Sequence, residues 1–369
     1  MPVNVGLAQL SDHFLLATVF FYAMAVLAYA GDFAFGRRGG KEPASVAAVP
    51  AEEVAEHARV AVGAGVAAQA AAVSPAPALQ AGTAGAAVIP VAATGGGDAG
   101  PAAVAPSRWR AGGPPAGPWI RAALALTVIG LASQIFGIAT RGIAEHRVPW
   151  GNMYEFVMAI TCMAVIAFLG LSFRFRVYSV GLFLMAPIVL ALGLCATVLY
   201  TAAGPLVPAL HSYWIWIHVT AMTVAIGSYI VAATFTVLYL VADRHARKQA
   251  ASPEAGFGAV LDRLPSADAL DRLSYRTVIF AFPIWTFAII AGAIWADQAW
   301  GRYWGWDPKE TWAFITWVIY AGYLHARATA GWRGRKAAYI QIVGFTSLLF
   351  NLIGVNLWIT GLHSYAGIN

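Results

Sequence analysis

The sequence predicts an all-α polytopic membrane protein with about eight transmembrane helices and with both termini outside. Of its 369 residues, 60% are hydrophobic and only 11% are charged, whereas a soluble domain carries about 25% charged residues. Several apolar runs reach the roughly 20 residues that a helix needs to cross a bilayer. The net charge of +6 therefore bears on membrane topology, and we expect no nucleic-acid partner.

Eight apolar segments are long enough to cross a membrane, and Pro, Gly or charged residues separate them. These segments are residues 12–31, 119–140, 153–173, 178–200, 213–242, 276–297, 311–328 and 337–359.

The first segment resembles a signal peptide, because residues 14–30 are apolar and end in small residues. However, the first basic residues, Arg37, Arg38 and Lys41, follow it, so we expect an uncleaved span with its N-terminus outside. If the spans alternate from there, only four of the 23 Lys and Arg residues lie outside. These four are Arg141, Arg147, Arg302 and Lys309. The asymmetry favours an external N-terminus and an external C-terminus.

The chain divides into three parts. Residues 1–33 hold the first transmembrane helix, and residues 34–117 are expected to form a flexible cytoplasmic linker rich in Ala, Gly and Pro. Within it, residues 38–106 contain no aromatic residue and so cannot build a packed core. Residues 118–369 are expected to form a seven-helix core with an external Trp-rich loop at 297–311.

Two kinds of chemistry are not encoded. The chain has no phosphate-binding glycine motif, so it holds no ATP-driven engine. Its two cysteines, Cys162 and Cys195, lie inside predicted spans and form no C-x-x-C pair. We expect both to be small core residues rather than a thiol relay.

The Trp-rich loop is the most informative segment. It places four tryptophans in 13 residues between two apolar spans; they are Trp300, Trp304, Trp306 and Trp312. An aromatic belt at the membrane interface explains one or two tryptophans at a helix end. Four in one loop favour a flat platform for a large planar ligand, such as a porphyrin.

Acidic residues beside this loop have a structural explanation. Asp307, Pro308 and Glu310 have the spacing of an N-cap, a first-turn proline and a capping-box glutamate. Asn152 and Glu155 repeat the pattern before the third span. We expect helix capping rather than catalysis from these acidic residues and from Asn152.

Three histidines are candidate metal ligands. His218 and His363 lie near the outer ends of their spans, at the level of the Trp-rich loop, and imidazole is a common axial ligand of haem iron. Either one alone could equally be an ordinary interfacial histidine. His325 lies about 20 Å deeper than Trp312 along its helix, and an ionisable residue at that depth suggests function. A hydrogen bond to a neighbouring helix would also explain His325. His211 is a weaker rival ligand.

The four external cations are candidate partners for the two carboxylates of a haem, because each defies the topology bias. Arg141, Arg147 and Arg302 are the residues we select for this role. Anchoring at the membrane interface explains any one of them equally well.

Together these motifs resemble a known family. The run Trp-Gly-Trp-Asp-Pro-Lys-Glu-Thr-Trp ending at Trp312 is similar to the tryptophan-rich "WWD" motif of haem-handling membrane proteins. The segments around His218, around His363 and from Pro149 to Glu155 resemble the CcsA/ResC-type protein of system II cytochrome c biogenesis. The resemblance covers residues 120–369 and leaves out the linker.

The resemblance implies a function and a set of ligands. His218 and His363 would be the external axial ligands of haem b held on the Trp-rich loop. His325 would be a ligand of a second, transmembrane haem, shared with a histidine of a ResB/Ccs1-like partner. Haem would pass outward and be attached through its two vinyl groups to the C-x-x-C-H motif of apocytochrome c.

The same resemblance implies a location and companions. The chain would lie in a bacterial plasma membrane, as an expected subunit of a holocytochrome c synthase complex. A thioredoxin-like thiol reductant would act beside it, since the nucleophiles are the thiols of apocytochrome c.

Three other function classes stay open at this stage. A solute transporter predicts paired broken helices, and no such symmetry is visible. A di-haem electron carrier predicts two histidines at matched depth, and His325 has no such companion in the sequence. A non-catalytic assembly scaffold would require none of the three histidines.

Overall fold

The computed structural model describes residues 3–36, 116–204, 210–251 and 261–363, and all regular structure in those ranges is helical. The principal helices are α1 (Val5–Phe35), α3 (Pro118–Glu145), α4 (Met153–Phe175), α5 (Gly181–Thr197), α6 (Tyr213–Ala251), α7 (Ala267–Trp300), α8 (Pro308–Ala328), α9 (Arg335–Leu349) and α10 (Val355–Trp358). A π-helical turn, η4 (Phe350–Gly354), joins α9 to α10, and single 3-10 turns lie at Tyr178–Val180 and Leu261–Arg263. The predicted all-α fold is confirmed.

Each of the eight predicted spans coincides with a helical segment. Seven of these segments, among the described residues, are long and apolar enough to cross a membrane, and the exception is α8. The multi-pass membrane class is therefore confirmed, with α8 as its least apolar member. α8 has 21 residues, which corresponds to a length of about 31 Å, and its Trp, Tyr and charged residues lower its hydropathy.

Helix boundaries differ from the prediction mainly at the charged ends. α6 continues to Ala251, and α7 starts at Ala267, because polar and charged residues extend a helix past its apolar stretch without breaking it. Most of the predicted linker, residues 34–117, lies outside the described residues, so its flexibility stays a prediction. Which end of the helices faces outward also stays a prediction.

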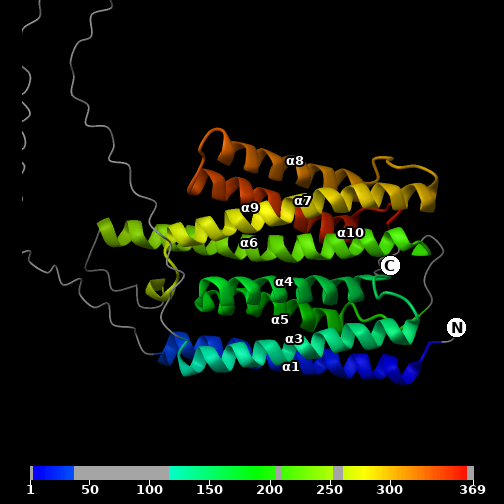
Figure 1. The fold of residues 1–369 in the computed structure, drawn as a ribbon, viewed down its shortest axis with the longest axis horizontal. Helices are drawn as coiled ribbons and strands as arrows, with labels where there is room; N and C mark the ends of the chain where they lie inside the picture. Colours follow the sequence, from blue (N-terminus) through cyan, green and yellow to red (C-terminus); the bar gives the residue numbers. More distant parts are fainter. Residues whose placement is uncertain (1–2, 37–115, 205–209, 252–260, 364–369) are drawn as a thin grey trace, which may run out of the picture. The chain divides into compact units, whose positions relative to one another are not determined.

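The helices fall into two groups that meet mainly where α4 packs on α6 (Figure 1). α1 packs on α3 and α5, and α4 packs on α3 and α5. In the other group α6 packs on α7 and α9, while α8 packs on α9 and α7. The contact of α4 with α6 joins the groups. Both helices also contribute residues to the cavity described below.

A glycine makes the junction of α4 and α6 possible. A Cβ atom placed on Gly227 of α6 would lie 2.7 Å from the main-chain nitrogen of Ala164 and 2.9 Å from the carbonyl carbon of Met163. Main-chain atoms cannot move aside as a flexible side chain would. Gly227 therefore sets how closely the two groups approach.

Successive long helices run in opposite directions, so the ends of several helices and the loops that join them lie together at one end of the molecule. Asn4 N donates to Ala144 O across the start of α1 and the end of α3, at 3.0 Å. Ser212 Oγ donates to Gln298 Oε1 at 2.5 Å, which joins the start of α6 to the end of α7. The Trp-rich loop and the end of the described chain lie at this same end (Figure 1).

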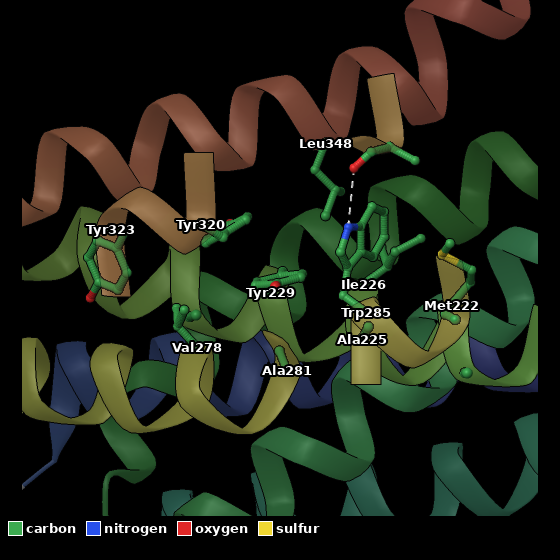
Figure 2. Close-up of a cluster of buried hydrophobic side chains, with 14 of the residues drawn as sticks. Met222, Ala225, Ile226, Tyr229, Val278, Ala281, Trp285, Tyr320, Tyr323 and Leu348 are labelled. Carbon is green, nitrogen blue, oxygen red and sulfur yellow. Dashed lines mark hydrogen bonds between the residues drawn. The ribbon is translucent and has the colours of Figure 1, made fainter. Parts of the chain in front are cut away.

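A buried aromatic cluster fixes α8 against α6 and α7 (Figure 2). The rings of Tyr229 and Tyr320 stack with centroids 4.1 Å apart. Trp285 of α7 meets Tyr229 edge-on at 6.0 Å, and its Nε1 donates to Ala313 O of α8 at 3.4 Å. The cluster sets the position of α8, whose first turn carries much of the site.

Adding one methyl group at Gly227 should weaken the junction of the two helix groups. We expect Gly227→Ala to lower stability by about 1–3 kcal/mol, since overpacking a tight contact costs that much. The readout is thermal or denaturant unfolding of the purified protein in detergent.

Gly170→Ala is the matched control, because Gly170 lies in α4 with open space around its Cβ position. Alanine gains helix propensity over glycine, so this variant should be as stable as the parent or more so. Equal destabilisation of both variants would contradict the role given to Gly227.

Candidate functional site

A cavity lies between α6, α7, α8, the start of α4 and the π-helical turn, at the end of the molecule that holds the Trp-rich loop. It encloses about 1140 Å³ of space, counting the part that opens to the exterior. Five tryptophans line its walls; they are Trp150, Trp285, Trp295, Trp300 and Trp304. The cavity thus offers several aromatic faces against which a planar ligand could pack.

His218 is held in this cavity through its neighbours on α7. Its Nδ1 lies 2.8 Å from Ala288 O, and because a carbonyl only accepts, Nδ1 carries the proton. The ring stacks on Trp295 at 6.1 Å with an angle of 11°. A Cβ atom on Gly292 would lie 2.6 Å from the ring, so glycine makes room for it. The arrangement directs Nε2 to the role of ligand.

His363 reaches the same cavity from the end of the described chain. Its Nδ1 lies 2.8 Å from Asp307 Oδ2, and its ring meets Trp300 and Trp295 edge-on at 5.0 and 5.7 Å. With Nδ1 bound to the carboxylate, Nε2 is the nitrogen suited to a metal. Trp295 therefore contacts both histidine rings, and the structure brings His218 and His363 together as candidate ligands of one site.

Asp307 connects the helix start to the chain end. Its side chain caps α8 by accepting from Lys309 N at 3.2 Å, and it accepts from Leu362 N at 2.7 Å. Burial alone would raise its pKa, but the hydrogen bonds from His363 and from the Leu362 and Lys309 N–H groups hold the pKa below its ordinary value of 3.8. Asp307 is thus a cap, as predicted, and also the residue that orients His363.

The predicted capping roles are confirmed. Glu310 completes the capping box by accepting from Asp307 N at 3.1 Å, and it also accepts from Gly305 N at 2.8 Å. At the start of α4, the Asn152 side chain accepts from Glu155 N. These contacts explain the D-P-x-E and N-x-x-E spacings without catalysis.

The four tryptophans of the loop divide into two pairs. Trp300 and Trp304 line the cavity. Trp306 is 65% exposed, has a left-handed backbone with φ of 58°, and meets Trp304 edge-on at 5.7 Å. Trp312 packs on Phe350 at 4.3 Å, behind the π-helical turn. The cavity wall therefore uses half of the predicted platform, and the other two tryptophans support it.

Three cations selected from the sequence do not line the cavity, among the described residues. Arg141 and Arg147 bind the buried carboxylates of Glu145 and Glu155, and Arg141 Nη2 also donates to Thr201 O at 2.6 Å. Arg302 pairs with Glu310 at 3.3 Å. Their observed partners are carboxylates of the protein, whereas Lys309 faces the cavity.

His325 is separate from this site. Its side chain is exposed on α8, and the step of 18 positions from Asp307 to His325 corresponds to about 27 Å along the helix. Arg327, one half-turn further, pairs with Asp271 at the start of α7, which marks the opposite end of the helices. His211 is exposed and does not belong to the cavity lining.

Sequence reasoning missed Trp295, Trp285 and Asn351 among the cavity residues. Both tryptophans lie inside an apolar span, where an aromatic residue looks like any core or lipid-facing residue. Their spacing to Trp300 along α7, five and fifteen residues, offered a weak signal. Asn351 is a polar residue within a span, which is itself a sign of function. The cysteines Cys162 and Cys195 are buried and unpaired with each other, as expected.

Comparisons with known proteins give one consistent family. Residues 150–363 match the family described as "Cytochrome C assembly protein". The chain is similar to "Cytochrome c biogenesis protein CcsA" of Guillardia theta, with 36% identity over 69% of this chain and 85% of that protein. Proteins with the same description from Gloeobacter violaceus and Synechococcus elongatus share 34% and 40% identity, over 66% and 48% of this chain and 86% and 67% of theirs.

Replacing Asp307 by serine should separate its two roles. Serine caps a helix well but is too short to reach His363, so we expect Asp307→Ser to lose about 1–2 kcal/mol from the charged hydrogen bonds alone. Because the folded pKa is lowered, this contribution is complete above about pH 4 and disappears as pH falls through the folded pKa. Thermal unfolding of both proteins from about pH 7 to pH 3 measures the difference.

Asp307→Ala is the companion variant, and it should lose the cap in addition, for a further loss of about 1 kcal/mol. A stability gap between the parent and Asp307→Ser that stays constant down to pH 3 would show that the carboxylate charge contributes nothing.

Proposed function

The chain belongs to the CcsA-type family of cytochrome c biogenesis proteins, and from this premise we propose that its aromatic cavity binds haem b and presents it for attachment to apocytochrome c. A role in cytochrome c biogenesis follows from the family. Haem binding, its ligands and the direction of transfer are the proposal. The observation that carries it is the meeting of His218 and His363 at one tryptophan, Trp295, inside one cavity.

The side chains of the cavity suit haem in three respects. Each histidine has Nδ1 fixed by an oxygen acceptor, which is the usual arrangement around a metal-bound imidazole. Tryptophan rings offer flat apolar surface to the two faces of a porphyrin. Two imidazoles would complete the six ligands of the iron.

The part played by this chain in the reaction is positioning. Each thioether forms when the S–H of an apocytochrome cysteine adds across a haem vinyl group, with sulfur bonded to one carbon and hydrogen to the other. No net oxidation or reduction occurs. The protein holds the substrate in a fixed orientation, which supplies the entropic part of catalysis. A thioredoxin-like reductant is needed only to keep the cysteine thiols reduced.

Product release requires that one axial histidine leave the iron. We infer that the histidine of the incoming C-x-x-C-H motif displaces it. His363 suits this exchange, because it lies at the end of the described chain and is held there by Asp307 and by ring contacts with Trp295 and Trp300.

His325 is proposed as the ligand of a second haem shared with a partner subunit. His325 is exposed on α8, which is not among the helices that meet the length and hydropathy of a membrane span. This supports contact with another protein rather than burial within this chain. A ResB/Ccs1-like membrane protein is the proposed partner, and the complex is a holocytochrome c synthase in the bacterial plasma membrane. Haem would move from the His325 end of α8 toward the Trp-rich loop.

Removing either cavity histidine should weaken haem binding. We expect His218→Ala and His363→Ala to lower haem affinity at least about tenfold, which equals about 1.4 kcal/mol, and to stop maturation of a co-expressed cytochrome c. A pyridine haemochrome assay on the purified protein gives the haem content.

His211→Ala is the matched control, because His211 lies on the same segment outside the cavity and should leave haem content unchanged. Full haem content and full cytochrome c maturation in both cavity variants would refute the proposed function.

His325→Ala should show a different defect. The protein purified alone should bind external haem normally, because His325 is about 27 Å from that site. When purified with its partner, the complex should contain about half of the haem of the parent complex. Unchanged haem in that complex would exclude His325 as a ligand.

A further inference from the structure

One wall of the cavity is the π-helical turn η4, which carries Asn351. In this turn Val355 N donates to Phe350 O, five residues back. Such turns are rare and are frequent at functional sites. Asn351 is only 9% exposed, yet its Oδ1 has no hydrogen-bond partner among the described residues. A buried amide oxygen without a partner costs free energy. A ligand in the cavity could form the missing hydrogen bond with the Asn351 side chain.

Lys309 brings a positive charge to the same wall. Among the described residues that line the cavity, it is the one lysine or arginine. Its Nζ donates to the main-chain oxygen of Asn351 at 2.7 Å. Burial lowers the pKa of Lys309 to about 8, although the nearby Asp307 carboxylate opposes the shift. A buried ammonium that meets a neutral carbonyl lacks a full counter-charge at that contact.

The carboxylates nearest to Lys309 are engaged elsewhere. Asp307 accepts from His363 and Leu362. Glu310 pairs with Arg302 and accepts from Gly305 N. Within the described part of the chain, neither acid forms an ion pair with the Lys309 ammonium. The cavity thus places Lys309 and Asn351 on one wall. Its other polar lining includes Asn152, Asn356 and the Glu310 carboxylate, which is paired with Arg302.

We propose that Lys309 and Asn351 form a subsite for one carboxylate of the haem. The subsite rests on the proposed function and deepens it. The Lys309 ammonium supplies charge and up to three donors, and Asn351 supplies its amide. Rotation about the last side-chain bond exchanges the amide oxygen and nitrogen, so Asn351 donates to a carboxylate or accepts from a carboxylic acid. Arg141 and Arg147 do not contribute.

This subsite fixes the orientation of the ring within its plane. The two carboxylates of haem lie on one edge and the two vinyl groups on the opposite side. Two axial histidines hold the iron but leave rotation about the axis between them unrestricted. A carboxylate held by Lys309 removes that rotation, so the vinyl groups always face the same way for the apocytochrome thiols.

Comparison of haem with its dimethyl ester tests the subsite, since the ester keeps the iron and ring but lacks both negative charges. The full chain, purified without haem, is titrated with each compound and followed by absorption. We expect the parent to bind haem about tenfold more tightly than the ester. Lys309→Gln should bind haem about tenfold more weakly and the ester unchanged. Lys336→Gln, at the opposite end beside Trp332, is the control and should bind like the parent.

Asn351→Asp is the second variant, and it tests whether a loss of haem binding could be due to misfolding. A carboxylate at position 351 pairs with Lys309 inside the protein, so this variant should unfold at a temperature no lower than the parent and yet lose the preference for haem over the ester. If the parent binds haem and ester equally, or if Lys309→Gln weakens both alike, the subsite is refuted and the haem site stands. If the parent binds neither compound, the proposed function falls as well.

Discussion

The carboxylate of Asp307 is the contact on which the rest of the site depends. It begins α8 through its bond to Lys309 N, and it ties down the end of the described chain through Leu362 and His363. The Asp307 side chain therefore helps to position the start of α8 and the candidate metal ligand His363. Because Lys309 lies in the first turn of α8, its position depends on the same contact. Any ligand bound by His363 is placed relative to α8 by this group.

The basic residues at this end of the molecule have two kinds of surroundings. Some are paired with buried carboxylates that join helices, whereas Lys309 lines the cavity. Arg141 and Arg147 are buried with Glu145 and Glu155 between α3 and α4, where each charge meets an opposite charge. Such a cluster joins helices. Replacing one of its charged residues by a neutral one would leave the opposite charge buried without a partner. In the cavity, by contrast, the Lys309 ammonium donates to a main-chain oxygen, while the neighbouring Asp307 carboxylate is bonded to His363 and Leu362. This difference underlies the proposed carboxylate subsite.

The sequence predicted the helices well because length and apolar composition dominate inside a membrane, where backbone groups must be satisfied within the helix. It also predicted the caps, since Asp307 and Glu310 act over three residues. The roles of the cations were harder to predict. The predicted topology marked Arg141, Arg147, Arg302 and Lys309 as unusual, but only the packing shows which of them meets a carboxylate of the protein. The π-helical turn at Asn351 and the position of Trp295 between two histidines depend on contacts between distant helices, and no local pattern encodes them.

The central claim is that His218 and His363 together ligate one haem in this cavity, and the most direct test is the ligation state of the iron. Near-infrared magnetic circular dichroism of the purified, oxidised protein should show low-spin iron with two imidazole ligands. His218→Ala and His363→Ala, reconstituted with haem, should each lose that signal and regain it when free imidazole is added. A bis-imidazole signal that persists in both variants without added imidazole would contradict the account.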